Sequence, residues 1–116
     1  MTEATGFAAS DIVLVYVACA DRDEARRIGR SLVARHLAAC VHIGDHEALY
    51  WWQDRIAEEP EAHLLVKTTG ARYPEARDHI LAGHSHALPG LTAWAVSGHA
   101  PFLGWITASC AKPEPG

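Results

Sequence analysis

The chain has 116 residues, of which 49% are hydrophobic and 21% charged, and this balance is typical of one soluble globular domain rather than of a disordered or fibrous chain. The net charge of −4 excludes the basic surface on which nucleic-acid binding depends, so we expect no nucleic-acid partner. No apolar run reaches the roughly 20 residues of a membrane span, and residues 1–10 lack the pattern of a signal peptide. We therefore expect a cytoplasmic protein with no membrane partner.

The first two predicted elements are a buried strand and an amphipathic helix. Residues 11–18 form a nearly continuous run of β-branched and aromatic side chains, which predicts a central strand covered on both faces. Asp21 is suited to cap the helix that follows, with Glu24 in the position of a capping box, and this helix is predicted to end near His36. Its buried stripe consists of Ala25, Ile28 and Leu32.

Residues 40–52 predict a second strand that ends in a run of aromatic side chains. A polar bend is expected around Gly44, after which the strand continues to Tyr50, Trp51 and Trp52. Successive side chains on a strand point to opposite faces, so these three rings are unable to enter one small core together. At least one ring needs another burial surface, and a second subunit is the expected source.

A hairpin and a second helix are predicted next. The charged residues 57–61, which include Pro60, are the expected turn, and residues 63–69 are the returning strand. Residues 73–83 are predicted to form the helix, because Pro74 is suited to its first turn. The remaining elements are a loop over residues 84–90, a strand over 91–97 and a short helix over 102–109.

This order of elements predicts an α+β fold of the ferredoxin-like, split βαβ type (βαββαβ), with an antiparallel sheet and an additional C-terminal helix. Residues 11–110 are expected to form the single domain, with flexible tails over residues 1–10 and 111–116. Helices on one face of such a sheet leave the other face without cover. The predicted fold therefore adds to the expectation of a second subunit.

The cysteines are predicted to be reduced. Cys19, Cys40 and Cys110 are odd in number and lack the CxxC spacing of a zinc ribbon or a redox dithiol. Cys19 ends one predicted strand and Cys40 begins another that runs parallel to it, so the two residues are separated by about 17 Å. A disulfide needs α-carbons within about 7 Å of each other, so we expect none between them.

Four segments together resemble the CutA family of divalent-cation tolerance proteins. They are LAACV at residues 37–41, the aromatic end at Tyr50 and Trp52, the returning strand with LLVKTT over residues 61–69, and FLGWI at residues 102–106. They occur in the order and at the spacing of the family. The resemblance implies a homotrimer in which the long hairpin strands pair with neighbouring subunits.

The resemblance also implies a metal site, which this sequence carries in part. Family members have been linked to copper and other divalent metals, with a strand cysteine and two adjacent histidines as proposed ligands. The corresponding positions here hold Val17, Gly83 and His84, of which the last alone matches. Cys19 lies on the same strand face as Val17, and His86 is close to the matching histidine. We therefore predict Cys19, His84 and His86 as ligands of copper or another divalent metal.

A small-ligand cleft between subunits is the alternative, by likeness to the trimeric PII-type signalling proteins. Lys67 stands in an apolar run, where a charge is costly unless it is paired or contacts an anion. Its predicted partners are Glu59, Glu61 and His84, and Trp52 is a predicted wall of the cleft. Such a cleft suits a small anionic ligand or a partner peptide, whereas a structural ion pair at the trimer interface is the other interpretation of Lys67.

No enzyme motif is found in the sequence. It contains no nucleophile elbow, no phosphate-binding glycine loop and no HExxH helix. We therefore predict a non-enzymatic trimer associated with the response to, or tolerance of, divalent metal ions. The loop after the second helix departs from the family, because His86 and Ala87 replace a tyrosine and an acid, so any inherited ligand chemistry is altered.

Overall fold

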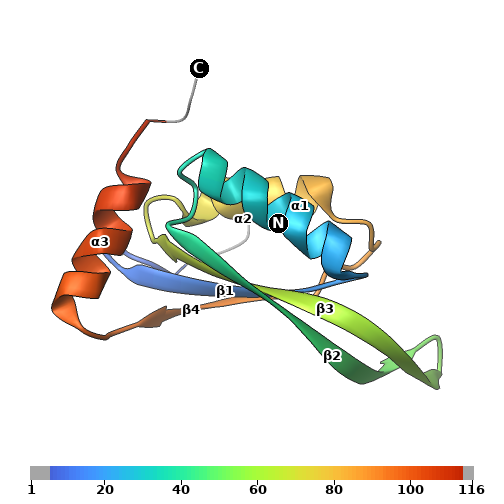
Figure 1. The fold of residues 1–116 in the computed structure, drawn as a ribbon. Coiled ribbons are helices and arrows are strands. Elements are labelled where there is room, and N and C mark those ends of the chain that lie inside the picture. The colour runs from blue at the N-terminus through green and yellow to red at the C-terminus, as the bar shows by residue number, and fades with distance from the viewer. Residues whose placement is uncertain (1–5, 114–116) are drawn as a thin grey trace.

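The computed structural model describes residues 6–113 and contains a four-stranded antiparallel sheet with strand order β2–β3–β1–β4 (Figure 1). In chain order the elements are β1 (Ile12–Cys19), α1 (Arg22–Ala34), β2 (Cys40–Trp52), β3 (Arg55–Thr69), α2 (Tyr73–Gly83), β4 (Leu91–Val96) and α3 (Ala100–Cys110). Helices α1 and α2 cover one face of the sheet, whereas α3 packs beside the end where β1 begins (Figure 1). The predicted ferredoxin-like fold with a C-terminal helix is confirmed. None of the helices within residues 6–113 combines the length and the apolar character of a membrane span.

The main core lies between the sheet and the helices α1 and α2. Alternate residues of β1, from Val13 to Cys19, are fully buried, and they belong to one cluster with Ile28 and Leu32 of α1. The intervening side chains of β1, such as Tyr16, are half-buried. β1 is therefore central, as predicted, but α1 and α2 cover only one of its faces, and on the other face Ile12 packs against α3.

The β2–β3 hairpin is longer than predicted. Its turn consists of Gln53 and Asp54, whose φ angles of 51° and 63° match the two-residue turns that suit the twist of a hairpin. The predicted turn at residues 57–61 is wrong, because these residues continue β3 and pair with β2. Pro60 is tolerated there since β1 does not reach this part of β3, which has one neighbouring strand instead of two.

The predicted bend at Gly44 is also wrong. Gly44 lies inside the continuous strand β2, opposite His63 of β3. A Cβ atom at Gly44 would lie 2.4 Å from His63 Nε2, so glycine makes room for the imidazole ring. In this strand glycine marks a close approach of a side chain to the backbone, and not a turn.

The predicted tails lie partly outside the described residues. Where the N-terminal tail is described, it packs: the Phe7 ring makes an edge-to-face contact with Tyr73, with 5.2 Å between the ring centroids. The Ala8 N–H also donates a 2.9 Å hydrogen bond to the carboxylate of Asp11. These contacts hold the described part of this segment against α2, because an aromatic ring gains burial there, while the flexible tails stay a prediction.

The cysteines are free thiols, as predicted. Cys19 pairs with Ala62 and Cys40 pairs with Lys67, so the two cysteines lie on strands that flank β3 and at different heights along it. Cys110 is buried at the end of α3, where its sulfur lies 3.8 Å from the hydroxyl of Thr68.

Candidate functional site

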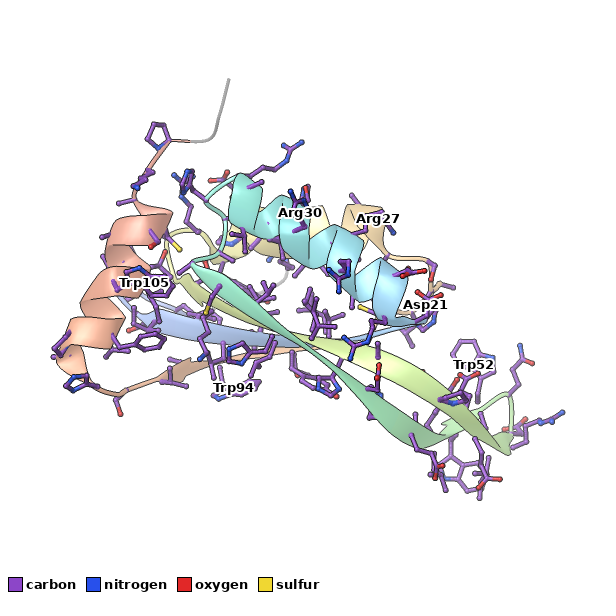
Figure 2. The ribbon with its side chains drawn as sticks, viewed as in Figure 1. Asp21, Arg27, Arg30, Trp52, Trp94 and Trp105 are labelled. Carbon is purple, nitrogen blue, oxygen red and sulfur yellow. The ribbon has the colours of Figure 1, made fainter. Side chains whose placement is uncertain are left out.

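Three potential metal donors converge at the C-terminal end of β1. Cys19 is the last residue of β1, Glu24 lies in the first turn of α1, and His84 directly follows α2. The Cys19 Sγ atom, a carboxylate oxygen of Glu24 and an imidazole nitrogen of His84 all lie within 4.8 Å of one another. Figure 2 shows this region beside the label of Asp21, where β1 passes into α1. We call these three residues the Cys19 cluster.

Glu24 is positioned by the start of α1. Asp21 caps the helix, because its carboxylate accepts a 2.8 Å hydrogen bond from the Glu24 N–H. The buried carboxylate of Glu24 in turn accepts hydrogen bonds from the N–H groups of Ala20 and Ser85, both at 2.8 Å. Burial by itself raises the pKa of Glu24, but hydrogen bonding and the nearby His84 leave this pKa below its ordinary value. An ionised carboxylate therefore joins the β1–α1 connection to the loop after α2.

Both ring nitrogens of His84 are engaged. Nε2 lies 2.6 Å from the carbonyl oxygen of Ala18, which can only accept, so Nε2 carries the proton in this arrangement. Nδ1 accepts the backbone N–H of His86 at 3.1 Å, and the two imidazole rings pack edge to face with their centroids 4.8 Å apart. A metal ion bound to His84 would replace one of these hydrogen bonds.

The thiol of Cys19 is held in its neutral form. Burial, together with the carboxylates of Glu24 and Asp21, raises the pKa of Cys19 to about 11. A metal ion needs the thiolate, so binding at this position must release a proton. The negative charges of these carboxylates disfavour the thiolate but attract a cation. A bound positive ion would in turn neutralise the charge that develops on the sulfur.

The structure brings together two of the three predicted metal ligands. Cys19 and His84 belong to the cluster, whereas His86 contacts His84 but lies outside the group of donor atoms. Glu24 supplies the third potential donor, and sequence reasoning missed it. Its capping-box spacing is the available signal, but its carboxylate reaches the N–H of Ala20 and not that of the capping residue.

An open groove follows the outer half of the β2–β3 hairpin. Trp52, Glu59 and Glu61 line it, as the predicted cleft requires, and residues 85–88 of the loop after α2 lie on its other side. The hydroxyl of Tyr50 donates to the carboxylate of Glu59. This hydrogen bond and the negative charge of Glu59 raise the pKa of Tyr50 to about 12.

Lys67 does not line this groove and lies near the C-terminal end of β3. Its Nζ atom is 5.1 Å from the centroid of the Phe102 ring of α3, which is the geometry of a cation–π contact. Because β3 is extended, the six-residue step from Glu61 to Lys67 spans about 20 Å. The predicted partners of Lys67 therefore do not meet it within this chain, and His84 belongs to the Cys19 cluster instead.

The sheet order, the long hairpin and the Cys19 cluster define a small ferredoxin-like α+β protein with a potential metal site at the end of its first strand. Residues 13–109 match the family described as "CutA1 divalent ion tolerance protein", and the chain belongs to this family. The resemblance inferred from the sequence is thereby confirmed.

Individual relatives agree with this assignment. The divalent-cation tolerance protein CutA of Archaeoglobus fulgidus is 34% identical over 93 residues, which cover 79% of this chain and 91% of that protein. The CutA protein of Thermus thermophilus is 34% identical over 98 residues, covering 83% and 93%. Among solved structures, CutA from Xylella fastidiosa matches with a TM-score of 0.83 and 34% identity over 86% of this chain and 98% of that one. The structure described as the periplasmic divalent cation tolerance protein CutA from Archaeoglobus fulgidus matches with a TM-score of 0.82 and 32% identity, over 85% and 98%.

Proposed function

We propose that this protein is a non-enzymatic participant in divalent-ion tolerance that binds a transition metal, copper in particular, at the Cys19 cluster. The observation that carries the proposal is the convergence of Sγ, carboxylate and imidazole donors of Cys19, Glu24 and His84 within 4.8 Å. The family name and the names of the curated relatives support a role connected with divalent cations.

The donor set fits a thiophilic metal. A thiolate and an imidazole suit copper(I) or zinc, and a carboxylate completes a three-ligand set that leaves a fourth position open. The deprotonation of Cys19 and the loss of one hydrogen bond of His84 oppose binding. The affinity should therefore be moderate and strongly dependent on pH.

The assembly as a homotrimer belongs to the same proposal. Leu49, Trp51 and Ile56 near the hairpin turn are 60%, 73% and 58% exposed, although they are large apolar side chains. Trp94 of β4 points away from α1 and α2 on the uncovered face of the sheet (Figure 2). Apolar surface of this extent is typical of an interface, and further copies of the same chain are the proposed cover.

A PII-like module that binds a small anion is less well supported. Among the described residues that line the hairpin groove, four are glutamates and Arg55 is the single lysine or arginine. This charge balance favours a cationic ligand over an anionic one. A cytoplasmic location remains our proposal as well, and the free thiols support it because a reducing compartment preserves them.

Metal titration tests the main proposal. Copper(I), with a competing chelator, and zinc(II) are titrated into the wild type and into Cys19→Ser, His84→Ala and Glu24→Gln. We expect Cys19→Ser and His84→Ala to weaken the tightest binding at least tenfold, since each removes a donor atom. Binding to the wild type should tighten about tenfold per pH unit near neutrality, because one thiol proton is released.

Cys40→Ser is the matched control. Cys40 is a partly buried free cysteine outside the cluster, so its loss should leave the affinity within twofold of the wild type. Equal affinities of the wild type and Cys19→Ser, or a wild-type affinity that does not change with pH, would contradict binding through the Cys19 thiolate.

A further inference from the structure

A second group of donors lies on the other face of the sheet. His46 of β2 pairs with Glu61 of β3, and Gly44 pairs with His63, so the side chains of His46, Glu61 and His63 share one face. Their neighbours on β3, Ala62 and Leu64, are buried in the core on the opposite face. His46, His63 and Glu61 thus lie on the face that α1 and α2 leave uncovered (Figure 1).

The two histidines face each other through the same type of nitrogen. His46 Nδ1 lies 2.8 Å from His63 Nδ1, and His46 Nε2 lies 3.0 Å from a carboxylate oxygen of Glu61. The carboxylate accepts a hydrogen bond from the Nε2–H group of His46, so a neutral His46 has its lone pair on Nδ1. His63 then donates its Nδ1–H to this lone pair, and a single proton lies between the two rings.

The surroundings hold both rings in place. Tyr16 of the neighbouring strand β1 stacks on His63, with 5.4 Å between the centroids and 27° between the planes. The missing Cβ of Gly44 leaves space for the His63 ring. The side chain of Glu61 is only 9% exposed and that of His46 only 23%, so the hydrogen bond between them is shielded from water.

We propose that His46 and His63 form a second binding site, one for a divalent transition-metal ion such as zinc(II), nickel(II) or copper(II). Moving the His63 proton from Nδ1 to Nε2 leaves both rings neutral and gives two Nδ1 lone pairs directed at the same place. A metal–nitrogen bond of about 2.0–2.1 Å then requires the two nitrogens to separate by a few tenths of an ångström. Imidazole ligands suit these metals, and water or a donor of a neighbouring copy completes the coordination.

Glu61 orients the site without binding the metal. A carboxylate that accepts the second N–H of a metal-bound histidine fixes the tautomer and makes the ring a better ligand. Its negative charge, shielded from water beside His46, also attracts a cation to the pair. This site uses no thiol and does not depend on the Cys19 cluster.

A titration of purified Cys19→Ser protein at pH 7.5 tests the site in isolation. Zinc(II) binding is measured by calorimetry, and cobalt(II) binding is followed by absorption, where the thiolate charge-transfer band should be missing. We expect one ion per subunit, and a loss of affinity of at least tenfold after His46→Gln or His63→Gln. Glu61→Gln should weaken binding by a smaller factor, because an amide oxygen still accepts the N–H of His46.

Two further variants make the test specific. His42→Gln removes another histidine of β2 that is exposed on the same face, and it should change the affinity by less than twofold. Gly44→Ala should displace the His63 ring and weaken binding while every donor is retained. The proposal fails if Cys19→Ser protein binds no metal, if His46→Gln or His63→Gln leaves the affinity unchanged, or if His42→Gln costs as much as His63→Gln.

Discussion

The thiol of Cys19 links metal binding to the alkaline stability of the fold. Burial and the neighbouring carboxylates of Glu24 and Asp21 raise its pKa to about 11 from an ordinary value of 9.0. Below pH 9 the thiol is protonated in both the folded and the unfolded state, so its contribution to stability is fully present. Between pH 9 and 11 the unfolded state loses this proton first, and the free energy of unfolding falls.

We therefore expect the wild type to lose about 2 kcal/mol of stability through Cys19 over this interval. Urea unfolding at pH 8, 9, 10 and 11 measures the loss, and Cys19→Ala provides the reference because other groups titrate identically in both proteins. The difference between the two curves isolates the thiol. A Cys19→Ala variant that declines as steeply as the wild type would show that the thiol has no raised pKa.

At this scale the sequence predicted part of the site. Cys19 and His84 were within reach of pattern reasoning, because alternation along a strand and the family resemblance both point to them. Glu24 could not be predicted in this way. Its carboxylate lies close to His84, which is sixty residues further along the chain in the loop that follows α2. Such a contact arises from tertiary packing, and no local spacing reports it.

Among the elements, α1 allows a direct test of its N-terminal cap, Asp21. Asp21 accepts the N–H of Glu24 and so satisfies a backbone donor that the helix leaves without a partner. Asp21→Ala should lower the free energy of unfolding by about 1 kcal/mol, measured by urea denaturation at pH 7. Asp23→Ala is the matched control, because Asp23 is an exposed acid in the same turn that is not the capping residue. Equal losses in the two variants would refute capping as the cause.

The hairpin shows where element prediction failed. Both strands were recognised from β-branched and aromatic residues, but the turn was placed too late in the chain. Neither Gln53 nor Asp54 is a glycine, although both adopt positive φ, so the usual sequence signature of a two-residue turn is missing. Pro60 and its acidic neighbours look like a turn, yet they form strand because pairing with β2 outweighs their weak β-propensity.

For the whole molecule, self-association is the prediction with the widest consequences. The hairpin extends beyond the rest of the sheet (Figure 1), and Trp51 near its end is 73% exposed. We expect sedimentation to show an assembled wild type at micromolar concentration and a smaller species for Trp51→Lys, with the fold retained. The apparent association constant should fall at least tenfold, because a charge at an apolar interface must be desolvated.

Leu81→Lys is the control for this experiment. Leu81 is also a large apolar residue, 39% exposed, but it lies on α2 and away from the hairpin. This variant should sediment like the wild type. A wild type that sediments as one well-folded subunit would contradict self-association.

The connectivity of β1 has a consequence for how the chain folds. β1 is made first, yet its partners Thr69 of β3 and Val96 of β4 are far along the chain, so both neighbours of β1 are in place only after most of the polypeptide has left the ribosome. The β2–β3 hairpin has no such delay, since its strands are joined by two residues. Until β1 pairs with β3, a nascent chain would expose the aromatic side chains of this hairpin and the unpaired edge of β3. Chaperones recognise intermediates of this kind.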